Sequence, residues 1–117
     1  MVNFALQFEG NPYVYGGTSL TNGADCSGFV MSVFANFGYS LPRVAAAQCE
    51  ASTKKDISQL EPGDLVFYGS GYIDHVALYI GDGKIIHASN AATGIKISDY
   101  DYEKPAAVVR SWNSCNA

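Results

Sequence analysis

Cys26 is the residue of this 117-residue chain whose type and position best suit nucleophilic chemistry. It stands between Asp25 and Ser27 at the predicted start of the most apolar helix. A helix N-terminus presents unpaired N–H groups and about half a positive charge, which favour a thiolate over a thiol. A nucleophilic cysteine also needs a base and a group that orients the base, and the two histidines, His75 and His87, are the candidates.

Each of these residues also has an ordinary structural interpretation. Cys26 would serve equally as a small buried apolar residue in a first helical turn, and each histidine as a half-buried strand residue. Three cysteines cannot all pair within one chain, so at least one thiol is free or pairs outside it. Cys49 falls in mid-helix and Cys115 in a polar tail, where a structural role is favoured for both.

The spacing of the two histidines predicts whether they act together. Both lie in predicted strands joined by Gly81-Asp82-Gly83. A three-residue loop with Gly83 in the left-handed conformation places Ala77 opposite His87, and both imidazoles project from one face with Cα atoms roughly 7–8 Å apart. A two-residue loop shifts the register by one and puts the rings on opposite faces. If the two histidines act together, the loop between their strands is therefore predicted to have three residues.

The elements that carry these residues indicate an α+β fold. Helical periodicity covers residues 2–8, 26–37 and 43–51, with Asp25 as N-cap of the second helix. Residues 11–23 favour loops with at most a short extended piece. Alternating patterns and turn residues predict strands at 65–68, 75–80, 84–89, 94–98 and 106–112. Helices followed by an antiparallel meander predict N-terminal helices packed on a five-stranded antiparallel sheet.

Length and composition favour one domain over residues 1–117 and exclude several classes of partner. Seven basic and eleven acidic residues leave a net charge of −4, the wrong sign for a nucleic-acid or polybasic membrane surface. No apolar run approaches the roughly 18 residues that span a bilayer. The spacing of Cys26, His75 and His87 matches no standard zinc site, and Gly16-Gly17 lacks the rest of a phosphate loop, so we expect neither metal nor cofactor.

Six segments together resemble the NlpC-type cell-wall peptidases, papain-like cysteine enzymes of bacteria and phages. They occur in the family's order between about residue 4 and residue 112. The segments are PYVYGG at 12–17, DCSGFV at 25–30, LPR at 41–43 with Gln48, PGDLVFY at 62–68, HVALYIG at 75–81 and IIHAS at 85–89.

The resemblance implies a papain-like α+β fold and a Cys-His-His triad. Cys26 corresponds to the family nucleophile, His75 to the base and later acid, and His87 to the residue that orients His75. The implied reaction is hydrolysis of peptidoglycan stem peptides between γ-D-glutamate and diaminopimelate or lysine. Two alternatives stay open: an N-acetylmuramoyl-L-alanine amidase or acyltransferase with the same Cys-His pair, and a non-catalytic cell-wall binding domain.

Five further residues are candidates for substrate binding. The resemblance implies this role for Asp25 and Ser27, which flank the nucleophile, and for Tyr13, which the family places near it. Tyr72 precedes His75 in a glycine-rich loop and is a candidate to line a groove. Arg43 is expected either to pair with an acidic group of the substrate or to cap local structure.

The wider setting is also inferred from the resemblance and the charge. Members that recycle released peptides carry a serine two residues after the LPR arginine; Ala45 stands there, which favours intact wall stems. We expect a monomeric domain of a longer protein, secreted to the bacterial cell wall, although the chain shows no signal peptide. A negative domain gains no attraction to an anionic wall, so targeting is expected to reside in other domains.

Overall fold

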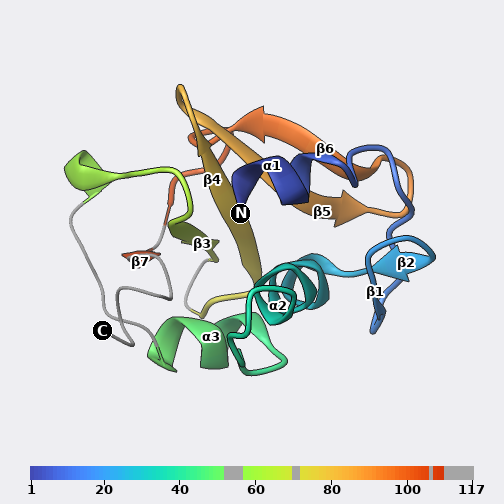
Figure 1. The fold of residues 1–117 in the computed structure, drawn as a ribbon. Coiled ribbons are helices and arrows are strands. Elements are labelled where there is room, and N and C mark those ends of the chain that lie inside the picture. Colours follow the sequence, from blue (N-terminus) through green and yellow to red (C-terminus); the bar gives the residue numbers. More distant parts are fainter. Residues whose placement is uncertain (52–56, 70–71, 106, 110–117) are drawn as a thin grey trace.

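Three short helices precede an antiparallel sheet, as predicted (Figure 1). The computed structural model describes residues 1–51, 57–69, 72–105 and 107–109. The helices are α1 (Val2–Leu6), α2 (Cys26–Ala35) and α3 (Ala45–Ala51), followed by the 3-10 turn η1 (Ile57–Gln59). The main sheet contains β3 (Leu65–Tyr68), β4 (His75–Gly81), β5 (Lys84–Asn90), β6 (Gly94–Asp99) and β7 (Ala107–Val109).

The five main strands are ordered β6-β5-β4-β3-β7 and pair antiparallel throughout. The predicted α+β class and five-stranded sheet are therefore confirmed. The strand expected at 106–112 is observed over Ala107–Val109, and its remaining positions lie outside the described residues. Cys115 also lies outside them.

The helices are shorter than the predicted ranges 2–8, 26–37 and 43–51. Helix α2 begins at Cys26, where the Asp25 side chain accepts a hydrogen bond from the Gly28 amide at 2.8 Å. It ends at Ala35, and Gly38 follows with a positive φ of 86° that a helix does not contain. Helix α3 starts two residues late, at Ala45, because the Val44 carbonyl accepts the first helical hydrogen bond, from the Gln48 amide.

The segment read as loops contains a second, two-stranded sheet of β1 (Thr18–Ser19) and β2 (Gly23–Ala24). This small sheet packs beside α2 (Figure 1). The contact is so close that a Cβ atom at Gly28 would collide with the carbonyl oxygen of Gly17. Glycine at position 28 therefore lets the loop lie directly against the start of α2, which sets the position of Cys26.

The central strands β3 and β4 are buried on both faces, so they are apolar at nearly every position, whereas β5 and β6 also carry polar residues. The larger core lies between the helices and one face of the sheet, where alternate residues such as Phe67, Val76 and Leu78 point. A smaller core on the other face contains Val66, Tyr68, Ala77, Tyr79 and Ile85, with Leu60 and Tyr100 packed against it. By strand alternation, His75 and His87 lie on the same face of the sheet as this smaller core.

The β4–β5 hairpin reaches the predicted register by a different turn. Leu78 pairs with Ile86 and Tyr79 with Ile85, which by extension puts His87 opposite Ala77. However, Gly81 pairs with Lys84, so the loop has two residues, and the register shifts between Tyr79 and Gly81. Asp82 and Gly83 both have positive φ, 55° and 75°, as a type I′ turn requires. The predicted three-residue loop is wrong: a bulge at Ile80 supplies the extra residue instead.

Candidate active site

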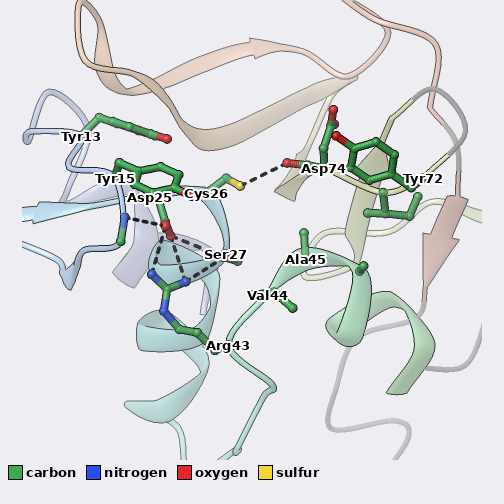
Figure 2. A pocket seen from close by; sticks show the side chains of 13 residues that line it. Tyr13, Tyr15, Asp25, Cys26, Ser27, Arg43, Val44, Ala45, Tyr72 and Asp74 are labelled. Carbon is green, nitrogen blue, oxygen red and sulfur yellow. Dashed lines mark hydrogen bonds and ion pairs between the residues drawn. The ribbon is translucent and has the colours of Figure 1, made fainter.

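The sulfur of Cys26 lies against the first residues of β4. Its thiol is 4.0 Å from the carbonyl oxygen of Asp74 (Figure 2). The backbone N–H of Val76 also interacts with the sulfur. Asp74 and Val76 are the two neighbours of His75 in the chain. The N-terminus of α2 and the start of β4 thus bring the predicted nucleophile beside the backbone that carries the predicted base.

The pKa of the Cys26 thiol is raised rather than lowered. Burial is the largest cause, and the Asp25 carboxylate adds to it. The amides of Val76, Ser27 and Cys26 itself oppose this shift. The helix N-terminus therefore does favour the thiolate, but the expected net preference for it is wrong, because desolvation outweighs the amides.

The two histidines form a hydrogen-bonded pair. His75 Nε2 lies 2.7 Å from His87 Nδ1, and the two ring centroids are 5.0 Å apart. The other ring nitrogen of His87, Nε2, lies 2.9 Å from the hydroxyl oxygen of Ser98 on β6. The predicted placement of both imidazoles on one face of the sheet is confirmed.

Both imidazoles are held neutral at physiological pH. His87 is 1% exposed, and burial, with the charges of His75 and Lys96, lowers its pKa from 6.5 to about 3. Burial also lowers the pKa of His75, against the opposing charge of Asp74. A neutral imidazole carries one N–H, so each bond in the chain from His75 to Ser98 has one donor and one acceptor.

Two tyrosines that the sequence analysis did not single out enclose the histidine pair. The Tyr68 ring lies 5.9 Å from that of His75, and the Tyr102 ring lies 5.4 Å from that of His87. Burial, followed by the charge of Glu103, raises the pKa of Tyr102 to about 12. Tyr68 is opposite His75 in the β3–β4 pairing, so a correct strand register would have found it. Tyr102 follows β6 and carries no such signal.

Cys26 opens into a cleft of about 680 Å³. All five predicted substrate-binding residues line it, namely Tyr13, Asp25, Ser27, Arg43 and Tyr72. Figure 2 shows Tyr13 and Tyr15 on one side of Cys26, and Tyr72 with Asp74 on the other. Tyr15 is 89% exposed and Tyr72 is 72% exposed, so the cleft has aromatic side chains on both rims.

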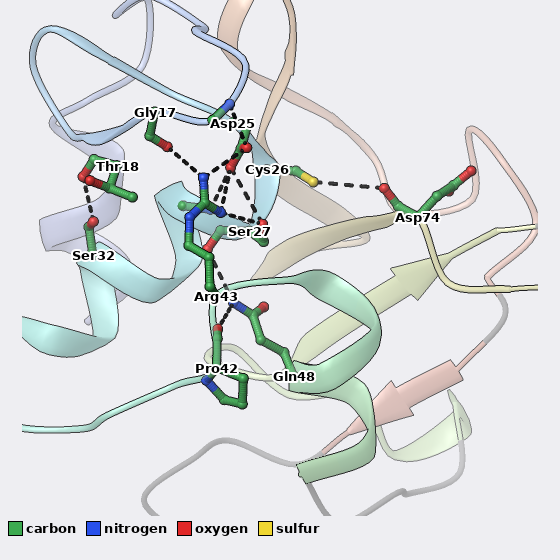
Figure 3. A network of polar contacts seen from close by, with 12 residues as sticks. Gly17, Thr18, Asp25, Cys26, Ser27, Ser32, Pro42, Arg43, Gln48 and Asp74 are labelled. Atoms are coloured by element: carbon green, nitrogen blue, oxygen red, sulfur yellow. Dashed lines mark hydrogen bonds and ion pairs between the residues drawn. The ribbon is translucent and has the colours of Figure 1, made fainter.

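Arg43 is bound to Asp25 and Ser27 rather than free in the cleft (Figure 3). Its guanidinium donates to both carboxylate oxygens of Asp25, at 3.1 and 3.0 Å, and to Ser27 Oγ at 2.9 Å. Burial alone would raise the pKa of Asp25, but hydrogen bonds from Arg43 and from the amides of Gly28 and Gly16 lower it overall. Of the two expected roles for Arg43, this geometry supports the local structural one.

Gln48 of α3 forms hydrogen bonds to the backbone next to the cleft. This fully buried side chain donates from Nε2 to the carbonyl oxygens of Ser27, at 3.2 Å, and Pro42, at 2.8 Å (Figure 3). The same segment supplies Val44, Ala45 and Ala46 to the cleft wall. The position that the resemblance singled out, Ala45, is therefore part of an apolar wall facing Cys26.

Among the described residues, no cluster of three histidine, cysteine or acidic side chains has a metal-binding arrangement. No helix in the described part of the chain is long and apolar enough to cross a membrane.

A family model and individual relatives both match this chain. The NlpC/P60 family model matches residues 10–111. A gamma-D-glutamyl-L-lysine dipeptidyl-peptidase from Bacillus subtilis (strain 168) is 41% identical over 110 residues, covering 88% of this chain but only 37% of that protein.

Solved structures agree. An NlpC/P60 family protein from Bacillus cereus ATCC 10987 has a TM-score of 0.87 and 34% identity, over 93% of this chain and 38% of that one. RipD from Mycobacterium tuberculosis, described as a non-catalytic NlpC/p60 domain protein adapted to peptidoglycan binding, has a TM-score of 0.80 and 26% identity, over 93% and 92%. The papain-like α+β fold is thereby confirmed, and the chain belongs to the NlpC/P60 family.

Proposed function

We propose that this chain is a cysteine endopeptidase of peptidoglycan stem peptides, with Cys26 as nucleophile, His75 as base and His87 as the orienting residue. One observation carries the proposal. The sulfur of Cys26 contacts the backbone on both sides of His75, whose Nε2 is bonded at 2.7 Å to His87. Because Nε2 of His75 is occupied by His87, its Nδ1 is the nitrogen that serves Cys26.

The first step transfers the thiol proton of Cys26 to His75 Nδ1. Burial raises the pKa of Cys26 and lowers that of His75, so both groups are neutral in the free protein. Proton transfer therefore accompanies attack on the scissile carbonyl, and His75 becomes an imidazolium whose Nε2–H donates to His87 Nδ1.

Attack forms a C–S bond and places negative charge on the former carbonyl oxygen. We assign the stabilisation of this oxyanion to backbone N–H groups at the start of α2, including that of Cys26. His75 then returns its proton to the departing amine as the C–N bond breaks, leaving a thioester. Water, deprotonated by His75, hydrolyses the thioester and restores the thiol.

The bond cut is inferred to be the one between γ-D-glutamate and the diamino acid that follows. The support is the 41% identical relative, which is named for the γ-D-glutamyl-L-lysine bond. The residue that follows γ-D-glutamate is either lysine or diaminopimelate in this proposal. The cleft is large enough for a peptide segment, and its aromatic rims suit an extended, partly apolar stem. Such a substrate places the activity at the bacterial cell wall.

Defined muropeptides with lysine or diaminopimelate stems test this proposal, with products read by mass. We expect fragments split after D-glutamate from the wild-type chain and from Cys49→Ala, which removes a thiol that α3 contributes to the larger core. We expect none from Cys26→Ala. Release of the intact stem from the muramoyl group would instead identify an amidase on the same residues.

A second candidate, non-catalytic wall binding, is favoured by the similarity to RipD. Binding of muropeptides without any cleavage, by both the wild-type chain and Cys26→Ala, would support it and contradict the peptidase.

A further inference from the structure

We propose that Ser98 is a positioning residue of this site, which accepts the Nε2–H of His87 and so keeps the Nδ1 lone pair of His87 directed at His75. The proposal rests on the proposed function, since it assigns a role within the group formed by Cys26, His75 and His87. It adds a residue from β6, a strand that contributes nothing to the cleft lining.

The position of Ser98 follows from the β5–β6 pairing. His87 is directly opposite Lys96, and Ser98 lies two residues farther along β6, on the same face of the sheet. Its hydroxyl oxygen is 2.9 Å from His87 Nε2, while His87 Nδ1 is 2.7 Å from His75 Nε2. Both ring nitrogens of a buried imidazole are thus engaged, which fixes the ring plane as well as the ring position.

A neutral His87 has two possible tautomers, and they have opposite consequences. With the proton on Nε2, His87 donates to Ser98 and accepts from His75 Nε2–H, so His75 Nδ1 is free to take the thiol proton. With the proton on Nδ1, His87 donates to His75 Nε2, and His75 must carry its own proton on Nδ1. In that arrangement His75 cannot act as a base towards Cys26.

The hydroxyl of Ser98 favours the first tautomer because a buried N–H without an acceptor is costlier than a buried lone pair without a donor. The groups that face His87 are His75 from β4, Lys96 and Ser98 from β6, and the Tyr102 ring. Lys96 is a cation and accepts no hydrogen bond. Ser98 therefore supplies the acceptor that the catalytically competent tautomer needs on this side of the ring.

Nitrogen-15 NMR of the imidazole rings tests the proposal without any substrate. We expect wild-type His87 to carry its proton on Nε2 and to show an unprotonated Nδ1. In Ser98→Ala we expect the Nδ1–H tautomer to become populated, and in Ser98→Thr, which retains the hydroxyl, we expect the wild-type pattern. A proton on His87 Nδ1 in the wild-type chain, or an unchanged pattern in Ser98→Ala, would overturn the proposal.

The pKa of His75 provides a second readout that lost packing alone would not move. An acceptor at His87 Nδ1 stabilises the His75 imidazolium, so its removal lowers the pKa of His75. We expect this decrease in Ser98→Ala, and its reversal in Ser98→Thr. Both are measured in a Cys26→Ala background, where no thiol titrates with the ring.

The kinetic consequence is a split between kcat and KM. Ser98 does not line the cleft, so we expect Ser98→Ala to lower kcat about tenfold, the scale of one hydrogen bond, with KM unchanged. Ser32→Ala is the matched control, because it removes a hydroxyl that donates to the Thr18 carbonyl away from the histidines. The two proposals can fail separately. If the wild-type chain shows the Nε2–H tautomer of His87 but cleaves no muropeptide, Ser98 is supported as a positioning residue and the peptidase proposal fails.

Discussion

At the scale of single residues, Asp25 receives hydrogen bonds from several segments that surround the nucleophile. Its side chain caps α2, accepts from the Gly16 amide and forms a two-pronged ion pair with Arg43. Its carboxylate oxygens are thus already occupied by protein donors. The immediate role of Asp25 and Arg43 is therefore to hold the residues on either side of Cys26, and any substrate contact is made by groups already fixed in place.

Replacing Arg43 with alanine tests this role. We expect a loss of about 1–2 kcal/mol in the free energy of unfolding at neutral pH, because a mostly buried carboxylate loses its charged partner while Arg43 itself is partly exposed. Urea unfolding measures it. Lys84→Ala is the control, since the Lys84–Asp99 pair is exposed and we expect no measurable change.

The pH dependence of that difference identifies its origin. The pKa of Asp25 is lower in the folded chain than its ordinary value of 3.8, so its contribution is present above that pH and is lost as the pH falls through the folded pKa. We expect the destabilisation by Arg43→Ala to shrink at acid pH. A difference that is constant with pH would show that Arg43 acts by packing alone.

At the scale of elements, the β4–β5 hairpin determines whether the two histidines meet. The two-residue turn alone would place the rings on opposite faces of the sheet, and the bulge at Ile80 reverses that shift. The turn needs positive φ at both Asp82 and Gly83. A three-residue loop with a glycine bulge would have required it only at the glycine.

Substitutions at Asp82 distinguish these turns. We expect Asp82→Asn to leave stability unchanged or slightly raised, since asparagine tolerates the left-handed region. Asp82→Val should cost about 1–2 kcal/mol, because a β-branched residue is strained there. Thermal unfolding of the pair measures the contrast. Equal stability of both variants would contradict positive φ at Asp82.

The junction between the small sheet and α2 provides a second test at this scale. Gly28→Ala would ordinarily stabilise a helix by about 1 kcal/mol. Here the added methyl group collides with the Gly17 carbonyl oxygen and lies 2.9 Å from an Asp25 oxygen. We therefore expect Gly28→Ala to be destabilising and to lower activity by displacing Cys26. A stabilised, fully active variant would show that the loop moves away without cost.

At the scale of the whole molecule, the site lies between two cores. Cys26 packs against the larger core, which lies between the helices and the sheet. The histidine pair lies on the opposite face of the sheet, next to the smaller core. Burying His87 in a neutral form links the stability of the entire chain to pH. Its pKa is about 3 in the folded chain and 6.5 when unperturbed, so the unfolded chain binds the extra proton between these values.

We therefore expect the free energy of unfolding to fall as the pH is lowered from about 6.5 towards 3. His87→Asn, which keeps an acceptor for His75 but does not titrate, should show a shallower decrease over this range. Urea unfolding at several pH values measures both slopes. Parallel slopes would mean that carboxylates, and not His87, dominate the acid response.

Local patterns were sufficient to predict the order of the elements and much of the site. The Asp25 cap and the apolar stripe after it located the helix that begins at Cys26, and alternation located the strands that carry His75 and His87. The sequence predicted at most a short extended piece where the structure has the paired strands β1 and β2, because two residues show no periodicity. The order of the six motifs along the chain indicated the family.

The sequence by itself therefore determined the fold class, the family and the residue types at the site. The fold class follows from short-range periodicity and capping, and the family and its site residues follow from the resemblance of six ordered motifs. Only the tertiary structure decided how the parts meet. The bulge at Ile80, the Ser98 hydroxyl on His87 and the Tyr102 ring over the pair all depend on strand register across the sheet. The raised pKa of Cys26 depends on burial by distant segments, which outweighs the helix-terminal charge that its position alone predicts.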